Sequence, residues 1–120
     1  MTAMDFSQQK PIYLQILDMI SDRVLSGEYK AGERIPSVRD FGADLGVNPN
    51  TVMRTFEKLT ADGIIFNKRG IGYFISDDAS SIILGNERKA FLEEEIPRIA
   101  SRARLLGISP GEIYEKLKEG

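Results

Sequence analysis

The sequence predicts a mainly α-helical chain with one small β-hairpin, followed by a C-terminal arm of two helices. Apolar residues recur at spacings of three and four in five segments, which is the helical period. Proline and capping residues open these segments, and glycines close them. Two short β-prone runs flank a glycine-rich link, which predicts the hairpin. With 120 residues, the chain has the length of one small domain plus an arm.

The composition argues against an enzyme. The chain has no cysteine and no histidine, so disulfides, thiol nucleophiles and thiolate metal sites are excluded. The densest acidic cluster is Glu93-Glu94-Glu95, but consecutive helical side chains point about 100° apart, which predicts a solvated helix face. We therefore expect no metal and no cofactor.

Nothing in the sequence predicts a membrane partner. The longest apolar runs, such as Ile82-Ile83-Leu84, fall far short of the roughly 20 residues that cross a bilayer. Met1 to Asp5 lack the basic start and apolar core of a secretory signal. We expect a cytoplasmic protein.

The first helix is expected from about Pro11, because an amphipathic stripe follows this proline and Gly27 supplies a stop. Its stripe consists of Tyr13, Ile16, Leu17, Ile20 and Val24. The segment from Lys30 to Glu33 reads as a turn.

Two short helices follow. Ser37 caps a helix that runs to about Leu45 and turns Val38, Phe41 and Leu45 inward. Asn48-Pro49 starts the next helix, which Gly63 ends. The apolar face of that helix consists of Val52, Phe56 and Leu59.

Strands are expected from Ile64 to Lys68 and from Gly72 to Ile75, joined by Arg69-Gly70-Ile71-Gly72. Two short helices, a tight turn and a hairpin form the plan of a winged helix-turn-helix. We assign this domain to residues 1–77.

Residues 78–120 are expected to form a helical dimerisation segment. We call five of its residues at heptad-like spacing the apolar seam: Leu92, Ile96, Ile99, Ala103 and Leu106. Pro97 lies inside this helix and is expected to bend it. Gly107 ends it, and Ser109 opens the last helix with a capping box. The seam follows a domain that is already complete, so we favour a homodimer interface over an intramolecular core.

Four segments of the chain together resemble a known family. They are Pro11-Ile12-Tyr13, Gly32-Glu33-Arg34-Ile35-Pro36-Ser37-Val38-Arg39-Asp40, Gly46-Val47-Asn48-Pro49-Asn50-Thr51-Val52 and Arg69-Gly70-Ile71-Gly72-Tyr73-Phe74. Their order and density over residues 10 to 75 are similar to the GntR family of bacterial transcription regulators. The short tail is similar to the YtrA-like subfamily, whose tail usually dimerises. The resemblance implies a sequence-specific DNA-binding regulator, expected to be a repressor that binds a palindromic operator as a homodimer.

The resemblance also implies which residues contact DNA. Ser37 and Arg39 match family positions that contact phosphates or bases, Thr51 matches a frequent phosphate contact, and Arg69-Gly70 matches the wing tip in the minor groove. Many relatives have an arginine where this chain has Met53, and a Leu-Ala pair where it has Phe41-Gly42.

Physical chemistry supports a similar set of contacts. Asn50 suits bidentate recognition of adenine, and Arg54 suits guanine. The predicted DNA-binding residues are Ser37, Arg39, Asn48, Asn50, Thr51, Arg54, Lys58, Arg69 and Gly70. Although 18 acidic residues outnumber 16 basic ones, residues 30 to 75 hold seven basic and five acidic side chains.

Other interpretations stay open at this point. Arg39 could pair with Asp40 or Asp44, and Arg69-Gly70 could be only a hairpin turn. A winged helix used for protein–protein contact without DNA is the alternative function. The sequence identifies neither the operator nor a small-molecule effector.

Overall fold

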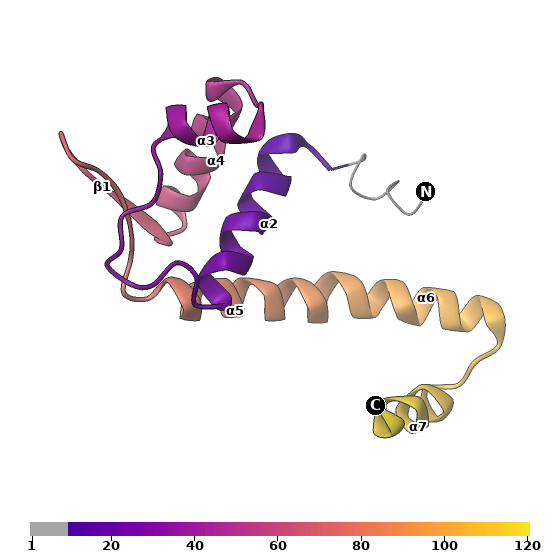
Figure 1. Ribbon diagram of the computed structural model, residues 1–120. Helices are drawn as coiled ribbons and strands as arrows, with labels where there is room; N and C mark the ends of the chain where they lie inside the picture. The colour runs from indigo at the N-terminus through magenta and orange to yellow at the C-terminus, as the bar shows by residue number, and fades with distance from the viewer. Residues whose placement is uncertain (1–9) are drawn as a thin grey trace. The chain divides into compact units, whose positions relative to one another are not determined.

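The computed structural model describes residues 10–120 (Figure 1). The opening residues, in which we saw no secretory signal, lie outside the described part. The described chain consists of helices and one antiparallel two-stranded hairpin, which confirms the predicted fold class. It divides into a compact unit that extends to Ile83 and a second unit, Leu84–Gly120. The two units are described one after the other.

The first helix, α2 (Ile12–Leu25), starts one residue later than expected. Pro11 occupies the N-cap, and its carbonyl oxygen accepts the amides of Leu14 and Gln15 at 3.0 and 3.2 Å. Proline suits this place because its own missing N–H leaves no donor without a partner. The buried residues of α2 follow the helical period and face the core: Ile16, Ile20, Ser21 and Val24.

Helices α3 (Val38–Leu45) and α4 (Pro49–Ala61) begin at the predicted caps. The Ser37 hydroxyl accepts the Asp40 amide at 3.1 Å, and the Asn48 side chain accepts the Asn50 amide at 2.8 Å. One detail of the prediction was wrong. Leu45, expected to face inward, is 39% exposed, because it is the last residue of a short helix.

The hairpin pairs β1 (Ile65–Lys68) with β2 (Gly72–Ile75). Its register sets Ile65 opposite Ile75, both buried. The sequence did not predict that a third extended stretch joins β2. The Ile35 amide donates to the Tyr73 carbonyl at 3.0 Å, and the Ile75 amide donates to the Glu33 carbonyl at 2.9 Å.

The core of the first unit joins all of these elements. Thirteen buried apolar residues form one cluster, and Ala79 and Ile83 from the start of α5 (Ala79–Ala90) belong to it. Phe56 of α4 lies at the centre of an aromatic chain. Its ring centroid is 5.7 Å from that of Phe41 and 4.8 Å from that of Tyr73, both edge-on. One side chain therefore links α3, α4 and the hairpin.

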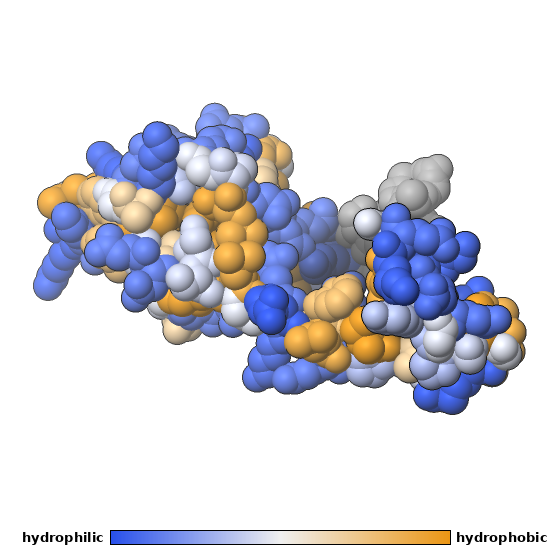
Figure 2. All heavy atoms as spheres, turned by 90° about the horizontal axis from the view of Figure 1, so that it is seen from below, coloured by the Kyte–Doolittle hydropathy of each residue, from blue (hydrophilic) through white to orange (hydrophobic). Residues whose placement is uncertain are grey.

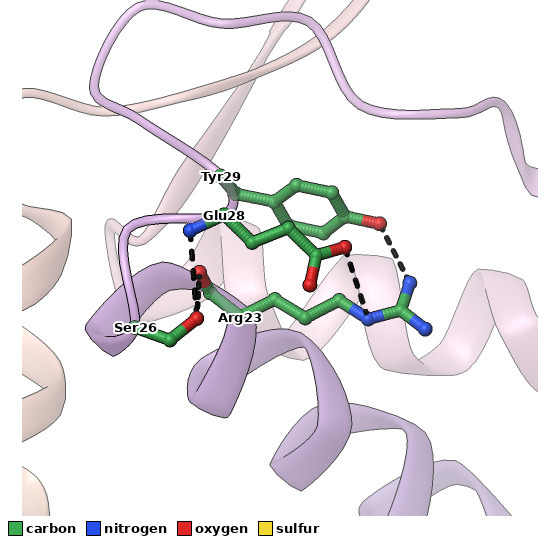
Figure 3. A network of polar contacts seen from close by, with 4 residues as sticks. All are labelled: Arg23, Ser26, Glu28 and Tyr29. Atoms are coloured by element: carbon green, nitrogen blue, oxygen red, sulfur yellow. Dashed lines mark hydrogen bonds and ion pairs between the residues drawn. The ribbon is translucent and has the colours of Figure 1, made fainter.

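A polar network closes the C-terminal end of α2 (Figure 3). The Arg23 guanidinium donates to the Tyr29 hydroxyl at 2.9 Å and lies 3.7 Å from the Glu28 carboxylate. The hydrogen bond that Arg23 donates to the Tyr29 hydroxyl raises the pKa of Arg23. Ser26 accepts the Glu28 amide at 3.4 Å and donates to the Arg23 carbonyl at 3.1 Å. This network fixes the chain as it leaves α2 and turns toward β2.

In the second unit, α5 continues through one π turn, η1 (Phe91–Glu95), into α6 (Ile96–Leu106). Pro97 has no N–H to donate to the carbonyl four residues before it. Just ahead of it, the Ile96 amide donates to the Phe91 carbonyl, five residues back, which widens the helix locally. The structure thus has a π turn just before Pro97, and the bend expected at this proline stays a prediction.

Gly107, with φ 70°, ends α6, and α7 (Pro110–Glu119) follows. The predicted capping box is present. The Ser109 hydroxyl accepts the Glu112 amide at 3.2 Å, and the Glu112 carboxylate accepts the Ser109 amide at 3.1 Å.

Candidate nucleic-acid interface

A close contact at Gly42 sets the turn between α3 and α4. A methyl group on Gly42 would lie 2.8 Å from the Val47 carbonyl oxygen. The Val47 amide donates to the Gly42 carbonyl at 2.9 Å, and Gly46 between them has φ 67°. The absence of a side chain at Gly42 therefore lets the turn pack directly on α3, and this packing aims the start of α4.

Helix α4 separates a buried face from a polar one, as predicted. Val52, Phe56 and Leu59 are completely buried. Among the predicted DNA-binding residues of this helix, Asn50, Arg54 and Lys58 are exposed and Thr51 is half-buried. An outward polar face on the second helix of a helix-turn-helix is the arrangement that enters a major groove.

Two of these side chains have neighbours that the sequence did not reveal. The Arg54 guanidinium carbon lies 4.0 Å from the centroid of the Tyr13 ring, which comes from the first turn of α2. The Lys58 ammonium lies 3.5 Å from the Asp62 carboxylate, one helical turn later. The first contact attracts the Arg54 cation to the face of the Tyr13 ring, and the second reduces the charge that Lys58 presents.

Ser37 and Arg39 lie at the start of α3, the helix before α4. Ser37 is half-buried and uses its oxygen as a cap, which leaves its O–H able to donate. Arg39 is exposed. Within residues 10–120 it forms no ion pair with Asp40 or Asp44. The described residues therefore do not support the pairing of Arg39 with Asp40 or Asp44, and its DNA contact stays a prediction.

The hairpin presents an exposed basic tip. Gly70 has φ 79°, and the Ile71 amide donates to the Lys68 carbonyl at 2.9 Å, which closes the turn with Arg69 exposed. The Lys68 ammonium lies 4.7 Å from the centroid of the Phe74 ring. An arginine at such a tip is long enough to enter a narrow minor groove, and the negative potential of that groove attracts its charge.

Sequence reasoning missed Arg34 as a candidate. The backbone of Arg34 forms an isolated antiparallel bridge with Phe74 of β2, and its guanidinium lies against Gly72. It is exposed and adds a positive charge at the turn end of the hairpin, since Gly72 is the first residue after the turn. The sequence signal for this extended stretch was the change from polar Arg34 to apolar Ile35, between the turn and Pro36.

In the second unit, four residues of the apolar seam are exposed. The exposed fraction is 59% for Leu106, 57% for Leu92, 47% for Ile99 and 39% for Ile96. Ala103 differs, because it is 8% exposed and is buried within its own chain. Figure 2 shows apolar side chains gathered on the visible face of this unit.

Open apolar grooves lie between α6 and α7. One, with a volume of about 420 Å³, is lined by Ile99, Ala103, Leu106, Ile108 and Ile113, with Glu95, Arg98 and Arg102 at its edges. A second groove shares Ile99, Ala103, Ile108 and Ile113 and extends to Leu117. The seam is thus part of a wider apolar surface that includes α7.

The described residues hold neither a membrane-crossing helix nor a group of three or more acidic side chains placed to bind a metal ion. The candidate interface consists of basic, amide and hydroxyl side chains together with the glycine at the hairpin tip.

Known proteins with the same organisation are bacterial regulators. Residues 12–75 match the family model described as bacterial regulatory proteins, gntR family. The HTH-type transcriptional regulator YhcF of Bacillus subtilis is 34% identical over 94% of this chain and 92% of its own length. The HTH-type transcriptional repressor YtrA of the same organism is 30% identical over 99% of this chain and 91% of its own length.

A solved structure extends the similarity to the fold. A GntR-family regulator from Bacteroides thetaiotaomicron has a TM-score of 0.78 and 42% identity, and the match covers 90% of this chain and 94% of that one. The family match includes both helices of the helix-turn-helix and the hairpin, the elements that carry every predicted DNA-binding residue. The chain is therefore not an enzyme but a helix-turn-helix transcription regulator, and it belongs to the GntR family of bacterial regulatory proteins.

Proposed function

We propose that this chain is a repressor that binds a palindromic DNA operator as a homodimer, in the cytoplasm. The observation that carries the DNA-binding part is the outward face of α4, which is polar and basic while its opposite face is fully buried. The repressor assignment draws on the similarity to YtrA of Bacillus subtilis, a transcriptional repressor by name.

Each candidate residue has a role that its chemistry suits. Asn50 and Arg54 read base edges in the major groove. Ser37, Asn48, Thr51 and Lys58 contact phosphates, which fixes the register. Arg39 binds a phosphate or a base next to α4. Arg69 and Gly70 form the tip that enters the minor groove.

We assign the DNA-binding domain to residues 1–77 and dimerisation to residues 78–120. One α4 helix reads only a few base pairs, whereas two copies related by a two-fold axis read a palindrome and gain affinity by linking two binding events. Four exposed seam residues and the grooves beside α7 offer the apolar surface that such an interface needs. Ala103, which is buried in its own chain, supports the packing beneath that surface.

Selection of bound DNA from a random pool tests the main claim. The selected sequence should be palindromic, and its affinity should fall steeply with salt because bound phosphates release counterions. Arg39→Ala and Arg54→Ala should each weaken binding by about 1–3 kcal/mol at one fixed salt concentration. Lys118→Ala, which removes an exposed cation of α7, is the control and should leave affinity unchanged. Equal affinity in all four proteins would reject the assignment of the two arginines.

A footprint tests the wing. Arg69→Ala should lose protection of the minor groove beside the α4 contacts while the rest of the footprint stays. An unchanged footprint would make the hairpin a purely structural element.

The oligomeric state tests the arm. Ile99→Glu introduces a charge into the seam, and Ser101→Glu introduces the same charge on the opposite side of α6. Light scattering at tens of micromolar should give a dimer for wild type and Ser101→Glu and a monomer for Ile99→Glu. A monomeric wild type, or a dimeric Ile99→Glu, would reject this interface.

A further inference from the structure

We infer that Tyr13 is a positioning residue that determines specificity, because its ring holds the Arg54 guanidinium in the orientation that reads a base. This inference rests on the proposed function and deepens it. It adds a residue of α2, outside the helix-turn-helix, to the machinery that selects the operator.

The contact is close and has the geometry of a cation–π pair. The Arg54 guanidinium carbon lies 4.0 Å from the centroid of the Tyr13 ring. At this distance the cation lies over the ring and is attracted to the negative face of the π system. Arg54 is exposed, and no acidic residue between Lys10 and Gly120 forms an ion pair with it.

The backbone of Tyr13 is held in place from α4. Thr55, the residue after Arg54, is completely buried, and its hydroxyl donates to the Tyr13 carbonyl at 2.7 Å. The same helix therefore carries both the guanidinium and the hydrogen bond that fixes the backbone under the ring. The backbone segments that carry Tyr13 and Arg54 therefore cannot move apart without breaking this part-buried hydrogen bond.

A guanidinium that lies face-on against an aromatic ring keeps its N–H donors directed outward in its own plane, so its base-reading edge stays free. Guanine presents two acceptors that such a fork satisfies together. An arginine without the ring would sample many rotamers and would have to be ordered each time it bound. Tyr13 therefore orients Arg54 before DNA arrives, and discrimination at one base pair depends on it.

Two substitutions of Tyr13 distinguish the effect of its aromatic ring from the effect of its apolar packing. Tyr13→Leu removes the π face and keeps an apolar side chain, and Tyr13→Phe keeps the ring. We expect Tyr13→Leu to lose about 3- to 20-fold in affinity for the selected operator, the range of one cation–π contact. Its preference at the base pair read by Arg54 should relax, while preferences at other positions remain. Tyr13→Phe should stay within about twofold of wild type.

A double-mutant cycle shows whether Tyr13 acts through Arg54. In an Arg54→Ala background, Tyr13→Leu should have no further effect on operator affinity. Losses that add in full, or a Tyr13→Phe protein as impaired as Tyr13→Leu, would overturn the inference. Urea unfolding reports whether each variant folds, and Tyr13→Met replaces Tyr13→Leu if the latter does not.

A measurement without DNA keeps the inference separate from the proposed function. In NMR spectra of the full chain, the Arg54 side-chain protons should be shifted upfield by the ring and should return to ordinary positions in Tyr13→Leu. Absence of that shift in wild type would overturn the positioning role. A wild-type chain that selects no DNA at all would reject the proposed function, whatever the NMR shows. A wild-type chain that binds DNA, combined with unchanged base preference in Tyr13→Leu, would reject this inference alone.

Discussion

The guanidinium of Arg34 lies directly against the backbone of Gly72, the first residue of β2. A methyl group on Gly72 would lie 2.8 Å from Arg34 Nε and 3.3 Å from Nη2. Gly72 also has φ 143°, a conformation that other residues rarely adopt. The glycine therefore serves two purposes, since it permits the strand to start and leaves room for a cation at the turn end of the hairpin.

Gly72→Ala should lower the free energy of unfolding by about 1–3 kcal/mol, because of the strained φ and the displaced guanidinium. The cost should be smaller in an Arg34→Ala background, where the new methyl group meets no guanidinium. Gly70→Ala is the control, because Gly70 also has a positive φ but its added methyl would lie in open space. Its cost should be the same with and without Arg34. Urea denaturation measures all of these, and an equal cost of Gly72→Ala in both backgrounds would refute the contact.

Gly42→Ala should destabilise the protein by about 1–3 kcal/mol, since the new methyl group would overpack against the Val47 carbonyl. Gly85→Ala, in α5, has open space around it and should stabilise by about 0.5–1 kcal/mol through helix propensity. Thermal unfolding checks both. A stabilised Gly42→Ala would mean that the turn after α3 relaxes more easily than its geometry indicates.

Ser37 allows capping to be separated from DNA contact. Ser37→Ala removes the cap and should cost about 1 kcal/mol of stability, whereas Ser37→Asp keeps a capping oxygen and should preserve it. The added carboxylate would repel phosphates, so Ser37→Asp should bind the operator more weakly than Ser37→Ala does. Ser109→Asp makes the same change at the cap of α7 and should not affect DNA binding. Wild-type affinity in Ser37→Asp would remove Ser37 from the interface.

Asp62→Asn should raise operator affinity by releasing Lys58 from its ion pair. The pair is exposed, so stability should change by less than about 0.5 kcal/mol. The gain should shrink as salt rises, because exposed charges are screened. Glu119→Gln releases Lys116 of α7 in the same way and serves as the control. Titrations in which Asp62→Asn and Glu119→Gln behave alike would show that Lys58 lies away from the DNA.

The features that the sequence predicted correctly are local or periodic. The caps at Ser37, Asn48 and Ser109 form within three residues, so neighbouring residue types suffice to find them. The buried face of α4 follows from helical spacing alone. The same spacing placed the candidate DNA-binding residues of α4 on its opposite side.

The features that the sequence missed depend on contacts between distant segments. Tyr13 was expected in an apolar stripe and in a segment of the family resemblance, and its contact with Arg54 needs α2 and α4 to be packed together. No extended pairing was predicted for Arg34 and Ile35, because their backbone partner comes from β2. Leu45 was assigned to the core by period, but the core does not extend to the end of its short helix. In each case the local sequence pattern predicts the backbone conformation, whereas the contact partners of the residue depend on tertiary packing.

The position of Phe56 between Phe41 and Tyr73 has a thermodynamic consequence. The helix proposed for the major groove and the hairpin proposed for the minor groove share one side chain in one core. Their relative placement is thus established when the domain folds, not when it meets a duplex. Calorimetry of operator binding should then give a heat-capacity change that matches the apolar surface covered by docking, without the larger contribution of a segment that folds as it binds.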